Sequence, residues 1–211
     1  YYAGPKDGSQ TLERELLRLI EQRAAPTVLV LPAGNTYRDR VTARMTLSPG
    51  AEGGVDWMIL PDCGTPSFLE IWLDTAASRS PVGLELSIPG TGVLAMAMPR
   101  DGMAKVLDAN GKPIGAIYFD ARAIGSTRSR ILVAISPTKT NKRNVAVAPS
   151  GSWGVKLMNT STSDVAAHLY IQREDTPAGS EPPGRQSYFE HRDAFGWDRE
   201  TGNYDRLEPS C

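Results

Sequence analysis

The chain has 211 residues, of which 40% are hydrophobic, and a formal net charge of -1. This length allows one large or two small domains, and the near-neutral charge gives no overall attraction to nucleic acid or to a membrane surface. We therefore expect no nucleic acid as a partner. Because the sequence also shows no signal peptide and no apolar run long enough to span a bilayer, we expect no membrane as a partner either.

The first predicted element is an amphipathic helix from Ser9 to Ala25. Its apolar residues recur at helical spacing and form one stripe, made by Leu12, Leu16, Leu19, Ile20 and Ala24. Ser9 or Thr11 can cap its start, and Ala25 followed by proline ends it. A helix with one such stripe is expected to pack that stripe against another element.

A short apolar run follows, from Thr27 to Leu31, and it leads through a proline into Ala33, Gly34 and Asn35. An unbroken apolar run bounded by turn residues favours a strand covered on both faces, as in a parallel sheet. Gly34 allows a sharp turn, and a rigid strand would determine where the amide of Asn35 points. A simple strand-ending turn is the alternative interpretation, since both residues are common in turns.

Helix, apolar strand and Ala-Gly-Asn turn together resemble one segment of the subtilisin-like serine peptidases, over about residues 10–37. In that family the helix packs on a parallel sheet, and the asparagine of the turn donates a hydrogen bond to the oxyanion of the tetrahedral intermediate. The resemblance implies that Asn35 is this catalytic donor. It also implies a peptide or protein substrate, and a secreted or periplasmic compartment.

The remaining motifs of that family are absent from the chain. A serine peptidase of this type brings Asp, His and Ser together, but no aspartate motif, His-Gly motif or Gly-Thr-Ser nucleophile motif is found. The two histidines are His168, followed by leucine, and His191, followed by arginine. We therefore expect an internal portion of a longer peptidase, inactive by itself, whose partner is the rest of the parent protein. A start at Tyr1 rather than Met fits this expectation.

From residue 37 onward the pattern changes to strands separated by turn residues. The predicted strands are 37–47, 55–60, 67–74, 82–88, 93–98, 104–107, 114–121, 130–136, 145–148, 153–159 and 165–173. Asn110 and Gly111 predict a tight hairpin turn between two of them. Regular strands with frequent turns predict an all-β sandwich, and its last strands resemble the ends of jelly-roll domains in bacterial peptidases.

The predicted fold is therefore mainly β, an antiparallel jelly-roll-like sandwich preceded by a short helix–strand piece. We divide the chain into a helix–strand segment (1–37), a β-sandwich domain (38–175) and an irregular tail (176–211). The tail opens with a stretch rich in proline and glycine and continues with aromatic and charged residues. Because disordered tails seldom carry so many aromatic residues, we expect it to pack on something, such as the peptidase body.

Several residue groups have two interpretations. Glu190, His191, Arg192 and Asp193 could supply a base, but no partner nucleophile is recognisable, so a surface polar cluster is favoured. His168 is more typical of a packed or surface strand residue than of a ligand. An arginine row on the outer face of residues 38–44 could attract an acidic ligand or simply face solvent.

Trp57, Trp72 and Trp153 could form a sugar-stacking platform, although strand tryptophans more often fill sandwich cores. Cys63 and Cys211 could pair, or Cys211 could be a free thiol. No Cys/His spacing typical of zinc and no phosphate-binding glycine motif is present, so no cofactor and no metal is predicted.

Three hypotheses follow. In the first, the chain is a non-catalytic internal portion of a subtilisin-like endopeptidase that carries the oxyanion Asn35 and an inserted sandwich. In the second, it is a stand-alone β-sandwich that binds carbohydrate or protein. In the third, it is a structural spacer. Trp57 and Trp72 exposed side by side would favour the second hypothesis.

Overall fold

The structure is a computed structural model that describes residues 4–30, 39–75, 80–96, 102–121, 126–143, 145–174, 176, 179, 181–191, 195–198 and 203–206. Within this part the chain forms one helix and thirteen strands. In chain order they are α1 (Thr11–Glu21), β1 (Thr42–Leu47), β2 (Glu52–Ile59), β3 (Ser67–Leu73), β4 (Val82–Ile88), β5 (Gly92–Met96), β6 (Met103–Leu107), β7 (Pro113–Asp120), β8 (Ser129–Ile135), β9 (Gly151–Asn159), β10 (Val165–Ile171), β11 (Tyr188–Glu190), β12 (Phe195–Asp198) and β13 (Asn203–Arg206).

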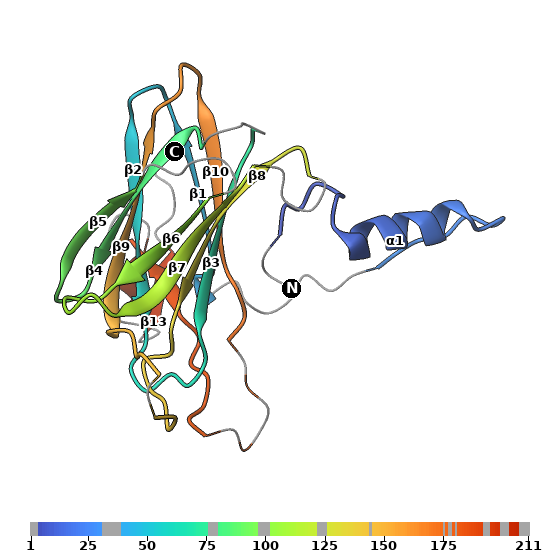
Figure 1. Cartoon of the computed structure of the whole chain (residues 1–211). Helices are drawn as coiled ribbons and strands as arrows, with labels where there is room; N and C mark the ends of the chain where they lie inside the picture. Colours follow the sequence, from blue (N-terminus) through green and yellow to red (C-terminus); the bar gives the residue numbers. More distant parts are fainter. Residues whose placement is uncertain are drawn as a thin grey trace.

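Eleven of these strands build two sheets that lie face to face (Figure 1). The six-stranded sheet has the order β1-β10-β3-β8-β7-β6, and the five-stranded sheet has the order β11-β2-β9-β4-β5. Every pairing between neighbouring strands is antiparallel. The predicted antiparallel β-sandwich is therefore confirmed.

The chain order of the strands is that of a jelly roll. Consecutive strands β1, β2, β3 and β4 alternate between the two sheets, and β8, β9 and β10 alternate again. Four strands of each sheet, β1-β10-β3-β8 and β2-β9-β4-β5, make up the eight strands expected of this fold. The β6–β7 hairpin extends one sheet and β11 extends the other.

A single large core lies between the sheets. Along β4 and β8 the residues alternate between buried and half-buried, so one face of each strand points into the core. Trp57, Trp153, Phe119 and Phe189 are the largest side chains of this core. Burying such aromatic side chains from both sheets supplies much of the driving force that holds the layers together.

The turn between β6 and β7 forms as predicted. Gly111 has φ 75°, and its N–H donates to the carbonyl of Asp108 at 3.0 Å. The Asp108 carboxylate accepts two more hydrogen bonds, from the N–H groups of Asn110 and Lys112. Two strand predictions were wrong in detail: residues 145–148 form no strand, and the first strand begins at Thr42 rather than at residue 37.

Helix α1 is confirmed, but it ends at Glu21, so the predicted stop at Ala25 was wrong, and its surroundings also differ from the expectation. Its N-cap is Gln10, whose N–H donates to the Glu13 carboxylate at 3.3 Å, rather than Ser9 or Thr11. None of its residues is buried, and the helix extends away from both sheets (Figure 1). The predicted packing of its apolar stripe is therefore not made by the parts of the chain that the structure describes.

The segment after the helix was predicted as a strand covered on both faces, and this prediction was wrong for its described part. Residues 27–30 have no strand partner, and Val28 and Val30 are 84% and 85% exposed. A central strand of a parallel sheet needs a neighbour on each side and helices above and below. The described part of the chain offers none of these neighbours at that place.

The tail predicted as irregular carries three short strands. β11 pairs with β2, where Phe189 lies opposite Trp57 and is buried, so this part of the tail packs on the sandwich. β12 and β13 pair with each other. The expected strand 165–173 is thus not the last one, and the division into three segments at residues 37 and 175 stays a prediction.

Candidate functional site

Asn35, the predicted oxyanion donor, lies outside the described residues. The structure does describe the chain that leads to it, which we call the arm (residues 11–30). Leu12, Leu17 and Leu19 are more than half exposed on the helix, and the exposed Val28 and Val30 follow. So much uncovered apolar surface on one projecting element is typical of a segment that a partner covers.

The arm joins the sandwich through the N-terminal strap (residues 4–10), which crosses the outer face of the six-stranded sheet. Its anchor is Glu70 on β3, which is only 2% exposed. The Glu70 carboxylate accepts hydrogen bonds from the N–H of Gly4 at 2.9 Å, from Trp72 Nε1 at 2.8 Å and from Gln172 Nε2 at 2.8 Å. Arg130 lies 3.7 Å from the same carboxylate. A buried charge satisfied in this way holds strap and sheet together.

Gly4 cannot easily be replaced in this strap. Its φ is +115°, a conformation that L side chains rarely adopt. A Cβ atom added there would lie 1.7 Å from Gln10 Nε2, but this is the flexible end of a side chain that can move aside, so the backbone conformation is the main constraint. The strap therefore needs glycine where its backbone meets Glu70.

Charged residues extend the contact along the strap. The Lys6 ammonium lies 4.1 Å from the ring centre of Tyr170, and Asp7 accepts a hydrogen bond from Ser126 Oγ at 2.6 Å. Arg128 donates to the carbonyl of Pro5 and pairs with Asp74. These contacts fix the point where the arm leaves the sandwich.

His168 on β10 lies on the same outer face of the six-stranded sheet, 3.5 Å from the Asp74 carboxylate. Burial lowers the pKa of His168, Arg128 and Arg44 lower it further, and Asp74 partly opposes them. A neutral imidazole beside an arginine-bound carboxylate fits the predicted packed residue rather than a ligand or a base.

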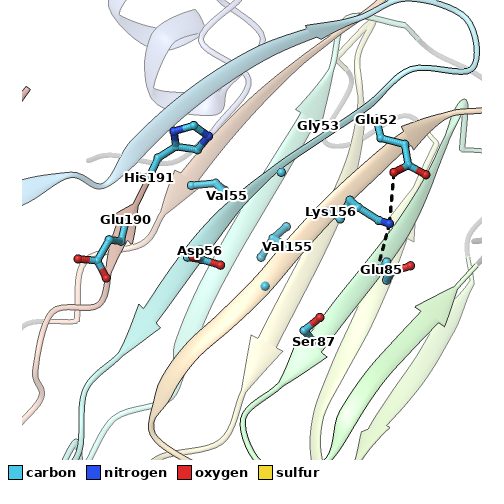
Figure 2. Close-up of a pocket in the computed structure, with 12 residues that line it drawn as sticks. Glu52, Gly53, Val55, Asp56, Glu85, Ser87, Val155, Lys156, Glu190 and His191 are labelled. Carbon is cyan, nitrogen blue, oxygen red and sulfur yellow. Dashed lines mark ion pairs between the residues drawn. The ribbon is translucent and has the colours of Figure 1, made fainter. Parts of the chain in front are cut away.

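A second feature lies on the outer face of the five-stranded sheet, where a hollow of about 530 Å³ is open to solvent (Figure 2). We call it the acidic hollow. Its floor has no side chain at Gly54 and Gly154. Its walls carry the carboxylates of Glu52, Asp56, Glu85 and Glu190. Lys156 lies between two of these, 3.3 Å from both Glu52 and Glu85.

The acidic hollow does not form a nucleophile–base pair. Ser87 is on β4 and His191 follows β11, and β2 and β9 lie between those strands. With strands about 4.8 Å apart, three spacings place the two residues far beyond hydrogen-bond reach. Of the cluster at residues 190–193, Glu190 and His191 line the hollow, and Arg192 and Asp193 lie outside the described residues.

The sugar-stacking interpretation of the tryptophans was wrong. Trp57, Trp72 and Trp153 are all 0% exposed. Each indole N–H has a partner, respectively Ser187 Oγ, Glu70 and the carbonyl of Pro149. Trp57 and Trp153 fill the core as expected, whereas Trp72 lies under the strap with Tyr170.

The remaining candidate residues are the arginine row, of which Arg38 lies outside the described residues, and the two cysteines. Arg40 of the predicted arginine row lies 4.1 Å above the Tyr188 ring, and Arg44 is exposed. Cys63 is a buried free thiol whose sulfur accepts a hydrogen bond from the Arg185 N–H; Cys211 lies outside the described residues.

Neither a metal site nor a membrane-spanning helix is found in the part of the chain that the structure describes. No three His, Cys, Asp or Glu side chains come together there as a possible metal site. Its helix is too short and too polar to cross a membrane.

Sequence reasoning missed Glu70 and the strap. The signal was present, because Glu70 is the single charge inside the run Ser67–Leu73, which is otherwise apolar after its first residue. On a strand with both faces covered, such a charge must find partners. The pattern did not show that residues 4–10 would provide one of them.

Comparison with solved structures gives a structural likeness, whereas comparison of the sequence gives none. No protein-family model and no curated protein matches the sequence. Among solved structures, the CspB protease of Clostridium perfringens has a similar fold, with a TM-score of 0.62 and 14% identity. The match covers 90% of this chain and 35% of the protease, so this chain spans about a third of that protein's length. The likeness shows a fold shared with part of a protease.

Proposed function

We propose that this chain is an internal portion of a subtilisin-like serine endopeptidase. In this proposal the arm belongs to the α/β body of the enzyme and leads into the oxyanion turn, and the jelly roll is inserted after that turn. The observation that carries the proposal is the exposure of the arm, whose helix has no buried residue. A helix of this kind gains most of its stability from packing its apolar face, so it needs the missing body.

The fold comparison supports the same proposal. The matched 90% of the chain is more than the span from β1 to β11, so it includes part of the flanking segments. A stand-alone sandwich that binds carbohydrate is less well supported, because the tryptophans of its expected platform are fully buried, two in the core and Trp72 on the outer face under the strap.

The division of roles follows from the chemistry of acyl transfer. A serine outside this chain attacks the peptide carbonyl, a histidine moves the proton and an aspartate orients the histidine. Asn35 donates its amide N–H to the oxyanion that forms. Such a donor raises kcat because it binds the tetrahedral intermediate better than the planar substrate carbonyl.

The proposal is tested on the full-length gene product that contains this chain. A fluorophosphonate probe should label one serine of the full-length protein and no serine of the 211-residue chain. Asn35→Ala should lower kcat on a peptide substrate by 10²–10³, on the order of what loss of this donor does in subtilisin itself, and KM should change little. Asn35→Asp should be at least as harmful, because a carboxylate repels the developing charge.

The matched control is the melting temperature of the 211-residue chain carrying Asn35→Ala, which should stay close to that of the unsubstituted chain. Full activity combined with a markedly lower melting temperature would mean that Asn35 only holds a turn. A full-length protein without a fluorophosphonate-reactive serine would reject the peptidase proposal altogether.

A further inference from the structure

We propose that the outer face of the six-stranded sheet carries a second docking surface, which the α/β body covers in the full-length protein together with the arm. This inference rests on the proposed function. The surface, called the apolar patch, consists of Phe68, Met103, Ala116, Tyr118, Leu132 and Ala134.

Strand register places these residues side by side. Met103 on β6 lies opposite Tyr118 on β7, and Tyr118 lies opposite Leu132 on β8. Ala134 lies between Ala116 and Phe68 in the next row on the same face. The patch is therefore continuous over four strands. Met103 and Tyr118 are its most open members, at 56% and 49% exposed.

The apolar patch adjoins a part of the same sheet face that the strap covers. Leu132 lies opposite Glu70 in the register of β8 and β3, and Glu70 anchors the strap. The strap covers the neighbouring part of this face, including Trp72 and Tyr170. The part nearest the strap thus has a third layer. The apolar patch lies beside it on the same face, bordered by Lys105 and by the Arg130–Asp120 ion pair.

The identity of the covering partner follows from where the arm leaves. The strap lies on this same face and runs directly into α1, so the uncovered stripe of the helix and the apolar patch start from the same side of the sandwich. A body that buries the arm therefore stands next to the patch. The opposite sheet carries the acidic hollow instead, and its carboxylates favour water over an apolar partner.

Hydroxyl-radical footprinting tests the inference with a control inside the chain. Met158 lies on the outer face of the five-stranded sheet and is 41% exposed, so it reports the other side of the sandwich. Oxidation of Met103 and Tyr118 should be at least about threefold slower in the full-length protein than in the 211-residue chain, because a packed interface excludes water. Oxidation of Met158 should be equal in both.

A pair of matched variants gives a second readout. Tyr118→Asp should lower the melting temperature of the full-length protein and leave that of the 211-residue chain nearly unchanged, since the ring is half exposed there. Met158→Asp places a second carboxylate opposite Glu52, so it should lower both melting temperatures by the same amount. Equal oxidation of Met103 in the two proteins, or protection of Met158 instead, would overturn the inference.

Other outcomes separate this inference from the proposed function. Concentration-dependent protection of Met103 in the 211-residue chain would assign the patch to a second copy and rule out the α/β body as the partner. If the fluorophosphonate labels the full-length protein but Met103 is oxidised as fast as in the 211-residue chain, the proposed peptidase function stands and the docking surface is rejected. If the fluorophosphonate labels no serine of the full-length protein but Met103 is protected there, the proposed peptidase function is rejected and the patch is still a covered surface.

Discussion

The two outer faces of the sandwich differ in the way that most informs function. On the six-stranded side, β3 is buried on both faces from Leu69 to Leu73, and the strap covers its centre. On the five-stranded side, β4 and β9 alternate between core residues and solvent-facing residues such as Glu85 and Lys156. A sheet face that buries aromatic and charged side chains together is typical of a face covered by a further layer. A face of carboxylates and glycines is typical of one exposed to solvent.

The largest expected effect comes from removing the anchor of the strap. Glu70→Ala leaves the N–H groups of Gly4 and Trp72 without their acceptor and should reduce the free energy of unfolding by about 3 kcal/mol. Chemical denaturation of the 211-residue chain measures this, and limited proteolysis should show faster cleavage within residues 4–10.

The matched control is Glu85→Ala on the other outer face. Glu85 shares an exposed lysine with Glu52, so its loss should change stability only slightly. If both variants lose similar stability, the two faces do not differ as described.

The next effect concerns the floor of the acidic hollow. A Cβ atom at Gly154 would lie 3.1 Å from Ser87 Cβ, tighter than an ordinary contact, so Gly154→Ala should reduce the free energy of unfolding by about 1 kcal/mol. At Gly83 on the neighbouring strand the nearest atom would be 3.7 Å away, and Gly83→Ala should be nearly neutral. Equal melting temperatures of the two variants would contradict the close packing across the hollow.

A smaller effect should appear as a pH dependence of the strap side. The pKa of His168 is lower in the folded chain, through burial and Arg128, so the unfolded chain binds the proton more readily. Stability from this residue is complete above the ordinary histidine pKa of about 6.5, which applies to the unfolded chain, and it is lost as the pH falls from there through the lower pKa of the folded chain. His168→Phe should flatten the fall in melting temperature between about pH 7 and pH 5. If the melting temperature of the variant falls with pH as steeply as before, other groups cause this fall.

The smallest effect is expected at Lys156. Its ammonium bridges Glu52 and Glu85, and these partners raise its pKa, but the side chains are open to water. Exposed ion pairs are screened by salt and add little stability. Lys156→Met should leave the melting temperature unchanged at physiological salt. A clear loss that salt does not diminish would show that the acidic hollow is less solvated than its exposure indicates.

Local patterns were sufficient for much of the fold. Alternation in 82–88 and 130–136 predicted β4 and β8 nearly to the residue, because a strand with one buried face must repeat every second position. The Asn110-Gly111 turn was predicted because positive φ suits glycine. The helical stripe of residues 12–20 correctly predicted α1, since a period of 3.6 is a property of the chain alone.

The sequence by itself thus determined the type and spacing of the elements, the antiparallel sandwich and the apolar character of the arm. Only the tertiary structure decided what each apolar surface meets: Val28 and Val30 read as buried and are exposed, while Trp72 is buried on an outer face by a strap from far along the chain. The physical reason is that periodicity encodes which face of an element is apolar. The partner of that face is set by contacts between distant residues, such as Gly4 with Glu70.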